Sequence, residues 1–154
     1  MKRIHLFLLL LMLSATTAVA QRADYRIIPL PKTVQTDTTH TFALHAGMGI
    51  AYDKADAGSE RNARFLQQWV EQATGLHLRL TPDAPRSAIR LVLQPEVKKT
   101  RKGKPADAPT PQQAEAYTLT VDAAGIVLSA TKQVGLFRAA ETLRQSLVFV
   151  LQGT

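Results

Sequence analysis

A change of hydrophobic period within residues 115–145, EAYTLTVDAAGIVLSATKQVGLFRAAETLRQ, constrains the fold more than any other feature. Apolar and polar residues alternate through YTLTV and again through IVLSA, with the turn sequence DAAG between them. This alternation predicts two half-buried strands, and Gly125 can take the positive φ that a tight turn needs. From Val134 the period lengthens to 3.6 residues, so a helix should follow the hairpin. Its apolar stripe consists of Leu136, Ala140, Leu143 and Leu147.

The residues before this segment predict a second helix. Residues 59–74 carry apolar side chains at helical spacing, with Trp69 beside them. Ser59 suits the N-cap position and Gly75 the C-cap position, because a serine oxygen accepts backbone N–H bonds and glycine adopts a left-handed conformation easily. The recurring apolar residues are Ala63, Leu66, Val70 and Ala73.

Five further short segments have the composition of strands. Pro29 and Pro31 lack a backbone N–H, so the first segment should lie at a sheet edge. Strands with one apolar face need helices on only one side. We therefore predict an α+β two-layer domain, with a mostly antiparallel or mixed sheet and two helices packed on one face. The five segments are residues 27–34, 41–45, 48–52, 76–80 and 89–93.

Residues 94–114 are polar, contain proline and show no period, so we predict a mobile basic loop that connects two strands as a hairpin. The loop includes the basic run KKTRKGK, Lys98 to Lys104. Without this run and the two basic residues at the N-terminus, 12 basic residues balance 12 acidic ones. The run is either a solvated loop or a contact for a polyanion. Nucleic acid is not an expected partner, because no aromatic residue lies among the lysines to stack on bases.

The N-terminus has the three parts of a secretory signal peptide. Two basic residues precede the apolar run Leu6 to Leu13, and AVA before Gln21 has the small-residue pattern of a cleavage site. We predict a signal peptide at residues 1–20 and a single exported domain, periplasmic or secreted, at residues 21–154. The apolar run is shorter than the ~20 residues that a spanning helix needs, so no membrane association is expected after cleavage. A retained membrane anchor is the alternative.

Histidine, glycine and nucleophile patterns give no site for catalysis or cofactors. His40 and His45 are five residues apart in a strand-like segment, so their side chains should point to opposite faces, and no HExxH spacing occurs. Gly47 and Gly49 lack the third glycine of a dinucleotide-binding loop. The chain has no cysteine and no Gly-x-Ser-x-Gly sequence. We therefore predict no metal ligand, no cofactor-binding residue and no cofactor.

The charged residues likewise form no catalytic set. No two acidic residues are adjacent. Asp122 falls in the predicted turn and Glu141 on the polar side of the last helix, so structural roles are favoured for both. Lys132 is expected to be exposed, and Arg138 is expected to be solvated rather than to hold an anion. We predict that no residue of this chain is catalytic.

Three segments of the chain resemble a known family. IIPLPKTV, EQATGLHLRL and, most specifically, residues 115–145 are similar to the small N-terminal domain of glycoside hydrolase family 20, the β-N-acetylhexosaminidases. The resemblance covers residues 25–147. It implies an α+β layer that packs against a catalytic (β/α)8 barrel, in which an adjacent Asp-Glu pair performs the chemistry. This sequence contains no Asp-Glu pair, so the resemblance assigns no catalytic residue to any position here.

The resemblance implies an accessory domain of an exported β-N-acetylhexosaminidase, which hydrolyses terminal N-acetylhexosamine residues of glycans. The expected partner is the barrel of the same polypeptide, and the chain is expected to be a fragment. The apolar run LVFVL supports this expectation, because a two-layer domain covers only one stripe of its last helix. Leu147, Phe149 and Leu151 should therefore pack on the barrel or mediate self-association.

Other functions stay open at this stage. A stand-alone carbohydrate-binding module would need an exposed aromatic platform, for which Tyr25, Tyr52 and Trp69 are the candidates. A polyanion-binding module would use Lys98 to Lys104. A free-standing enzyme would need a catalytic pair that the sequence does not show. Related small domains precede the barrels of O-GlcNAcase-like and α-glucuronidase-like enzymes, so another glycosidase family is an alternative parent.

Overall fold

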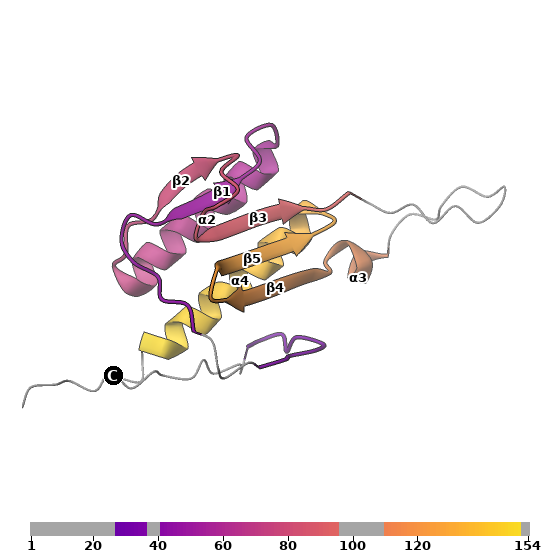
Figure 1. Ribbon diagram of the computed structural model, residues 1–154. Helices are drawn as coiled ribbons and strands as arrows, with labels where there is room; N and C mark the ends of the chain where they lie inside the picture. Colours follow the sequence, from indigo (N-terminus) through magenta and orange to yellow (C-terminus); the bar gives the residue numbers. More distant parts are fainter. Residues whose placement is uncertain (1–26, 37–40, 96–109, 152–154) are drawn as a thin grey trace, which may run out of the picture.

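Figure 1 shows the chain as a computed structural model, in which we describe residues 27–36, 41–95 and 110–151. For residues 148–151 only the backbone is described. The predicted signal peptide and the basic run Lys98 to Lys104 lie outside the described residues. None of the helices in the described part is long and apolar enough to cross a membrane.

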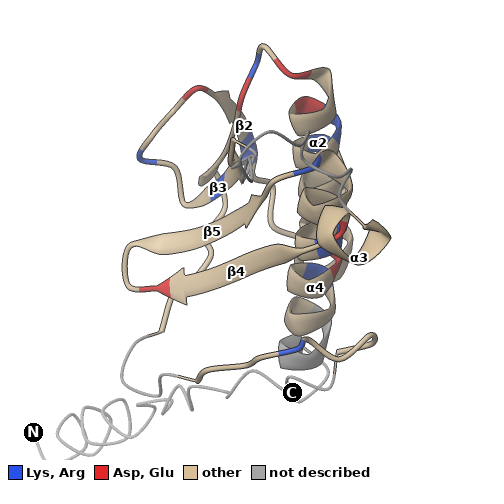
Figure 2. Cartoon of the chain, turned by 90° about the vertical axis from the view of Figure 1, so that its right-hand side faces the viewer, with Lys and Arg blue, Asp and Glu red and all other residues tan. Residues whose placement is uncertain are grey.

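One mixed sheet and two long helices form the domain. Five strands lie in the order β2-β1-β3-β5-β4, with parallel pairing throughout except between β4 and β5. Helices α2 and α4 cover the same side of the sheet, which we call the helix side; the opposite side is the outer side (Figures 1 and 2). The elements are β1 (Gly49–Tyr52), α2 (Ala57–Thr74), β2 (Arg79–Pro82), β3 (Ile89–Leu93), α3 (Pro111–Ala114), β4 (Tyr117–Asp122), β5 (Gly125–Ala130) and α4 (Gln133–Leu151).

This architecture confirms the α+β two-layer fold and the mixed sheet. A mostly antiparallel sheet is wrong, because α2 connects β1 to β2 as a crossover, and a crossover returns the chain in the same direction. The predicted hairpin across residues 94–114 is also wrong. Strand β5 lies between β3 and β4, and it pairs with β3 in parallel from Ile89 opposite Ile126 to Leu93 opposite Ala130. The end of this segment also forms the short helix α3.

The core lies between the sheet and the helix pair. The predicted alternation places Ile126, Leu128 and Ala130 of β5 on the helix side, where all three are buried. The predicted stripe of α4 meets them, with Leu136, Ala140 and Leu143 buried and Leu147 packed against the core. From α2, the buried apolar residues are Ala63, Leu66 and Val70.

Helix α2 begins earlier than predicted, because its N-cap lies three residues before Ser59. Its N-cap is Asp56, whose carboxylate accepts a hydrogen bond from the N–H of Gly58 at 2.8 Å. Ser59 is therefore not the cap; it is fully buried, and its hydroxyl donates to Asp56 Oδ2 at 3.3 Å. The predicted C-cap is confirmed, because Gly75 has φ of 71° and its N–H donates to the carbonyl of Glu71.

The predicted turn between β4 and β5 is confirmed and requires glycine for two reasons. Gly125 has φ of 143°, which L side chains rarely adopt. A Cβ at this position would also lie 2.5 Å from the carbonyl oxygen of Ala88, just before β3. The Asp122 carboxylate completes the turn by accepting the N–H groups of Ala124 and Gly125.

Three strand predictions in the first half of the chain need correction. Residues 27–34 and 41–45 form no strand. In the first segment Pro29 and Pro31 cannot donate hydrogen bonds to a neighbouring strand. Residues 41–45 alternate in polarity but pair with no strand of the described sheet. The strand predicted at residues 76–80 begins instead at Arg79. The carbonyl of His77 before it accepts the N–H of Gly47, in the turn that precedes β1.

Candidate interaction surface

Three aromatic side chains join the two long helices at their solvent-exposed rim. Phe65 and Trp69 lie one turn apart on α2, and their rings stack with centroids 5.9 Å apart. Phe137 of α4 meets both rings edge-on, with centroid distances of 6.1 Å to Phe65 and 5.7 Å to Trp69. We call these three residues the aromatic cluster. Edge-to-face and stacked rings attract each other beyond simple burial, so the cluster fixes how α2 packs against α4.

The aromatic cluster is only partly covered by the described residues. Phe65 is 38% exposed, and Val134 in the first turn of α4 is 40% exposed. Arg144 of α4 lies 5.5 Å from the centre of the Trp69 ring, where its charge is attracted to the ring face. The helix side therefore presents apolar and aromatic area at a position where an isolated helix pair would normally present charged side chains.

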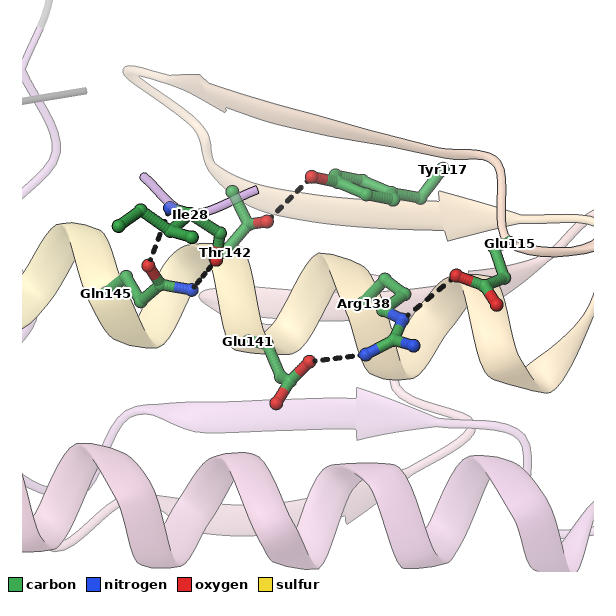
Figure 3. Close-up of polar contacts among 7 residues, drawn as sticks. All are labelled: Ile28, Glu115, Tyr117, Arg138, Glu141, Thr142 and Gln145. Atoms are coloured by element: carbon green, nitrogen blue, oxygen red, sulfur yellow. Dashed lines mark hydrogen bonds and ion pairs between the residues drawn. The ribbon is translucent and has the colours of Figure 1, made fainter. Parts of the chain in front are cut away.

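A second apolar area comes from the segment before β1. Ile27 is buried, whereas Ile28 is 82% exposed and Leu30 is 74% exposed. The side-chain amide of Gln145 on α4 fixes this segment: its oxygen accepts the N–H of Ile28, and its nitrogen donates to the carbonyl of Ile28, both at 3.0 Å (Figure 3). The paired bonds hold exposed apolar residues beside α4.

Polar contacts on the flank of α4 fix its position against β4. Arg138 donates to Glu115 at 3.2 Å and to Glu141 at 3.1 Å, and the Tyr117 hydroxyl lies 2.7 Å from that of Thr142 (Figure 3). The carboxylates of Glu141 and Glu115 raise the pKa of Arg138. The expectation of a merely solvated Arg138 is therefore wrong, and its guanidinium is engaged within the domain.

The start of α4 is held to α2 by a partly buried amide network. Gln133 donates to the carboxylate of Asp56 and, at 3.0 Å, to the hydroxyl of Ser59. Asn62, which is buried, donates to both the backbone and the side-chain oxygen of Gln133. Each polar group in this network has a partner, so it orients the two helices without a cost for unsatisfied groups.

The residues weighed as catalytic candidates occupy structural positions. Asp122 closes the hairpin turn and Glu141 pairs with Arg138. Lys132 was expected to be exposed and is half-buried. In the described part of the chain, no group of three His, Asp or Glu side chains could hold a metal ion.

The structure describes some of the histidine and aromatic residues weighed from the sequence. His45 is exposed, and exposed His77 lies 3.2 Å from the Glu71 carboxylate. Tyr52 is buried in the core and offers no platform for a sugar. Trp69 belongs to the aromatic cluster, whereas Tyr25 and His40 lie outside the described residues.

Sequence reasoning missed two parts of this surface. Phe65 could have been found, because it precedes Trp69 by four residues and so shares its helix face. The contact of these rings with Phe137 could not, since it depends on how two helices distant in sequence pack together. The tether between Gln145 and Ile28 joins residues 117 positions apart and left no local signal.

Solved structures with the same fold come from enzymes that act on N-acetylhexosaminides. An N-acetyl-β-hexosaminidase from Streptomyces plicatus, in complex with Thio-NAglucal, matches 79% of this chain at 28% identity and a TM-score of 0.61. The family 20 β-N-acetylhexosaminidase from Streptomyces coelicolor A3(2) matches the same share at 27% identity and a TM-score of 0.60. The chain covers 21% of each of these proteins.

A family model covers nearly the whole described chain. The model described as glycosyl hydrolase family 20, domain 2, matches residues 24–148. A comparison with curated protein sequences found no match. The matched range includes every strand of the described residues, α2, α4 as far as residue 148 and the tether at Ile28, so the match and the fold describe the same unit. The chain therefore belongs to the family of glycosyl hydrolase family 20, domain 2.

Proposed function

We propose that this chain is an accessory domain of an exported β-N-acetylhexosaminidase. In this role it performs no chemistry and supports the (β/α)8 barrel that removes terminal N-acetylhexosamine residues from glycans. The family match and the neighbouring hexosaminidase structures, of which this chain covers about one fifth, support the proposal. The signal-peptide pattern at residues 1–20 supports export.

The single observation that carries the docking role is the aromatic cluster on the helix side. Phe65 and Val134 keep 38% and 40% of their area in water, whereas burying an apolar side chain fully contributes about 1.5–3 kcal/mol. The exposed Ile28 and Leu30 lie on a segment tethered to the same helix pair. We infer that the barrel covers the helix side, and that the outer side of the sheet stays in solvent.

We infer that the described carboxylates do no acid–base or nucleophilic work on a glycoside. Hydrolysis of this kind needs two carboxyl groups across the scissile bond, or one carboxylic acid with the acetamido group of the substrate. Each described carboxylate has a backbone or side-chain partner within the domain. These residues are Asp53, Asp56, Glu60, Glu71, Asp83, Glu115, Asp122 and Glu141. The proposed role is therefore structural support.

The experiment is to sequence the gene beyond codon 154 and compare two purified chains. The longer reading frame should encode a barrel with an adjacent Asp-Glu pair, and its product should release p-nitrophenol from a p-nitrophenyl N-acetylglucosaminide. The 154-residue chain should release none. Activity in the 154-residue chain itself, or a downstream frame without such a barrel, would overturn the proposal.

A further inference from the structure

The outer side of the sheet carries a hollow that the docking role does not use. It has a volume of ≈ 440 Å³ and lies where β1, β2 and β3 begin, beside the turn between β4 and β5. Arg79 and Arg86 line it, together with the hydroxyl groups of Thr81 and Ser87. We call this the arginine hollow. No carboxylate is among its lining residues, so it is a concave site of positive charge.

The acidic residues nearest in sequence to the arginine hollow are engaged elsewhere. Asp83 pairs with Lys54 at 3.2 Å, and hydrogen bonds from Lys54 lower the pKa of this carboxyl group. Asp122 accepts two backbone N–H groups within its turn. Among the described residues Arg86 has no ion-pair partner. The positive charge of the hollow is therefore left for a ligand.

Two backbone features hold the polar groups of the hollow in place. Arg79 donates from Nε to the carbonyl of Gly47 at 2.7 Å, which fixes the guanidinium through one nitrogen. The hydroxyls of Thr81 and Ser87 lie 2.7 Å apart above Gly49. A Cβ on Gly49 would lie 2.8 Å from Thr81 Oγ1 and 3.0 Å from Ser87 Oγ, so the paired hydroxyls occupy the space of a side chain. The two hydroxyl groups therefore pack directly against the backbone of β1 at Gly49.

An apolar wall completes the hollow. Phe42 and Met48 line it and are half-buried against the core. A sugar ring has apolar C–H faces and polar edges, so it matches a site with one apolar wall, hydroxyl groups and charged donors. Guanidinium groups are suited to sulfate and carboxylate, because their N–H groups can bond two oxygens of an oxyanion in parallel.

We propose that the arginine hollow binds an anionic saccharide, with its sulfate or carboxylate group at Arg79 and Arg86. The choice of a saccharide as carrier rests on the proposed function, since a hexosaminidase meets glycan chains. The hollow would then hold a glycan on the outer side of the sheet, which the docking role leaves in solvent. Sulfated or uronate-containing glycans would be favoured over neutral ones.

The test is a calorimetric titration of the full 154-residue chain. The five basic residues between Lys98 and Lys104 are replaced by serine in every sample, so that this run cannot bind the probes. The probes are a heparin-derived tetrasaccharide, neutral chitotetraose and inorganic sulfate. We expect saturable binding of the heparin tetrasaccharide, and binding at least about tenfold weaker for the other two probes, because each lacks one half of the ligand.

Arg86→Ala is the decisive variant, because Arg86 is exposed and has no hydrogen bond or ion pair with the described residues. It should weaken tetrasaccharide binding roughly tenfold, the effect of losing a charge-assisted contact. Arg61→Ala on α2 is the matched control, with the same loss of charge on the helix side, and should change the affinity less than about twofold. Ser87→Ala removes one hydroxyl without adding atoms and should weaken binding by a smaller factor.

Three results would overturn the inference. If chitotetraose bound as tightly as the heparin tetrasaccharide, the hollow would not require an anionic group. If inorganic sulfate bound as tightly, the hollow would not require a saccharide. Equal losses in Arg86→Ala and Arg61→Ala would show that overall charge, not the hollow, governs binding. None of these results affects docking of the helix side or the activity of a longer chain, so the two proposals fail independently.

Discussion

The two sides of the sheet leave different chemistry in contact with water. The outer side, which no described helix covers, presents hydroxyl groups from Thr118, Thr120 and Ser129 and the half-buried Arg90. The helix side, which has its own covering layer, presents Phe65 and the rest of the aromatic cluster. A bare sheet in water should be polar and a covering helix should be charged outside. The outer side also exposes Val92, and α2 also exposes charged residues such as Arg61 and Arg64. The difference lies in the aromatic cluster, a group of rings in mutual contact on the helix side, which we propose a partner covers.

The largest expected effect tests which side carries the core. Leu128 and Val127 are neighbours on β5 that point to opposite sides, and Leu128 is fully buried whereas Val127 is half-buried. Leu128→Ala should lower the free energy of unfolding by about 3 kcal/mol, through lost burial and a residual cavity. Val127→Ala should cost about 1 kcal/mol or less. Urea unfolding measures both, and equal losses would contradict the one-sided core.

The next effect concerns the turn that sets the register of β5. A shift of one residue in the pairing of β5 would move its buried side chains to the outer side of the sheet. The turn at Gly125 fixes this register. Gly125→Ala should destabilise the chain by about 2–3 kcal/mol, because it combines an unfavourable φ with a contact at 2.5 Å to Ala88. Gly75→Ala is the control: its φ is also positive, but a Cβ there meets nothing within 4 Å, so about 1 kcal/mol is expected.

Removing the hydrogen bonds between α2 and the start of α4 should lower the free energy of unfolding moderately. Gln133→Ala removes the amide that joins Asp56, Ser59 and Asn62, and it should cost about 1–2 kcal/mol of unfolding free energy. Gln68→Ala, an exposed glutamine on α2, should change stability by less than about 0.5 kcal/mol. Thermal unfolding measures both losses. Equal losses in the two variants would contradict a specific role of Gln133 in joining the helices.

A smaller effect concerns the tethered apolar segment. Gln145→Ala should cost about 1 kcal/mol or less, since both of its bonds to Ile28 are exposed to water. The clearer readout is local: amide exchange at Ile28 should accelerate strongly, while amides of β5 keep their protection. Unchanged exchange at Ile28 would mean that the tether does not hold the segment beside α4.

The smallest effect is the titration of Asp83 near the arginine hollow. Its pKa is lowered from the ordinary value of 3.8, chiefly by hydrogen bonds from Lys54. The contribution of this pair to stability is therefore full above that ordinary value and is lost as the pH falls through the lowered one. Carboxyl NMR should show the low pKa, and Lys54→Ala should raise it only part of the way, because the backbone N–H of this residue, the largest cause of the lowered pKa, remains. An unchanged pKa in the variant would contradict the pairing.

Local signals made the C-terminal half predictable. The alternation of β4 and β5, the turn at Gly125 and the stripe of α4 lie within one short segment, and each contact they predict is near in sequence. The parallel pairing of β3 with β5 joins distant segments through no local signal, which is why a hairpin was expected there instead. Residues 41–45 show the converse: alternation without a neighbouring strand gave no strand.

The interaction surface was predictable only in part. The sequence identified Trp69 as flanking the core, but the aromatic cluster depends on the packing of α2 against α4. The absence of an Asp-Glu pair was readable directly, because it is a property of neighbouring residues. The arginine hollow was not, since Arg79 and Arg86 are brought together with Gly49 only by the sheet order.

Hydrogen–deuterium exchange tests the central claim most directly, by comparing the 154-residue chain with the proposed longer chain that would include the barrel. Docking of the helix side predicts stronger protection of amides in α2 and α4, and at residues 27–34, in the longer chain. Amides of the outer-side loop at residues 83–88 should exchange alike in both chains. Protection confined to that loop, or no change in α2 and α4, would contradict the account.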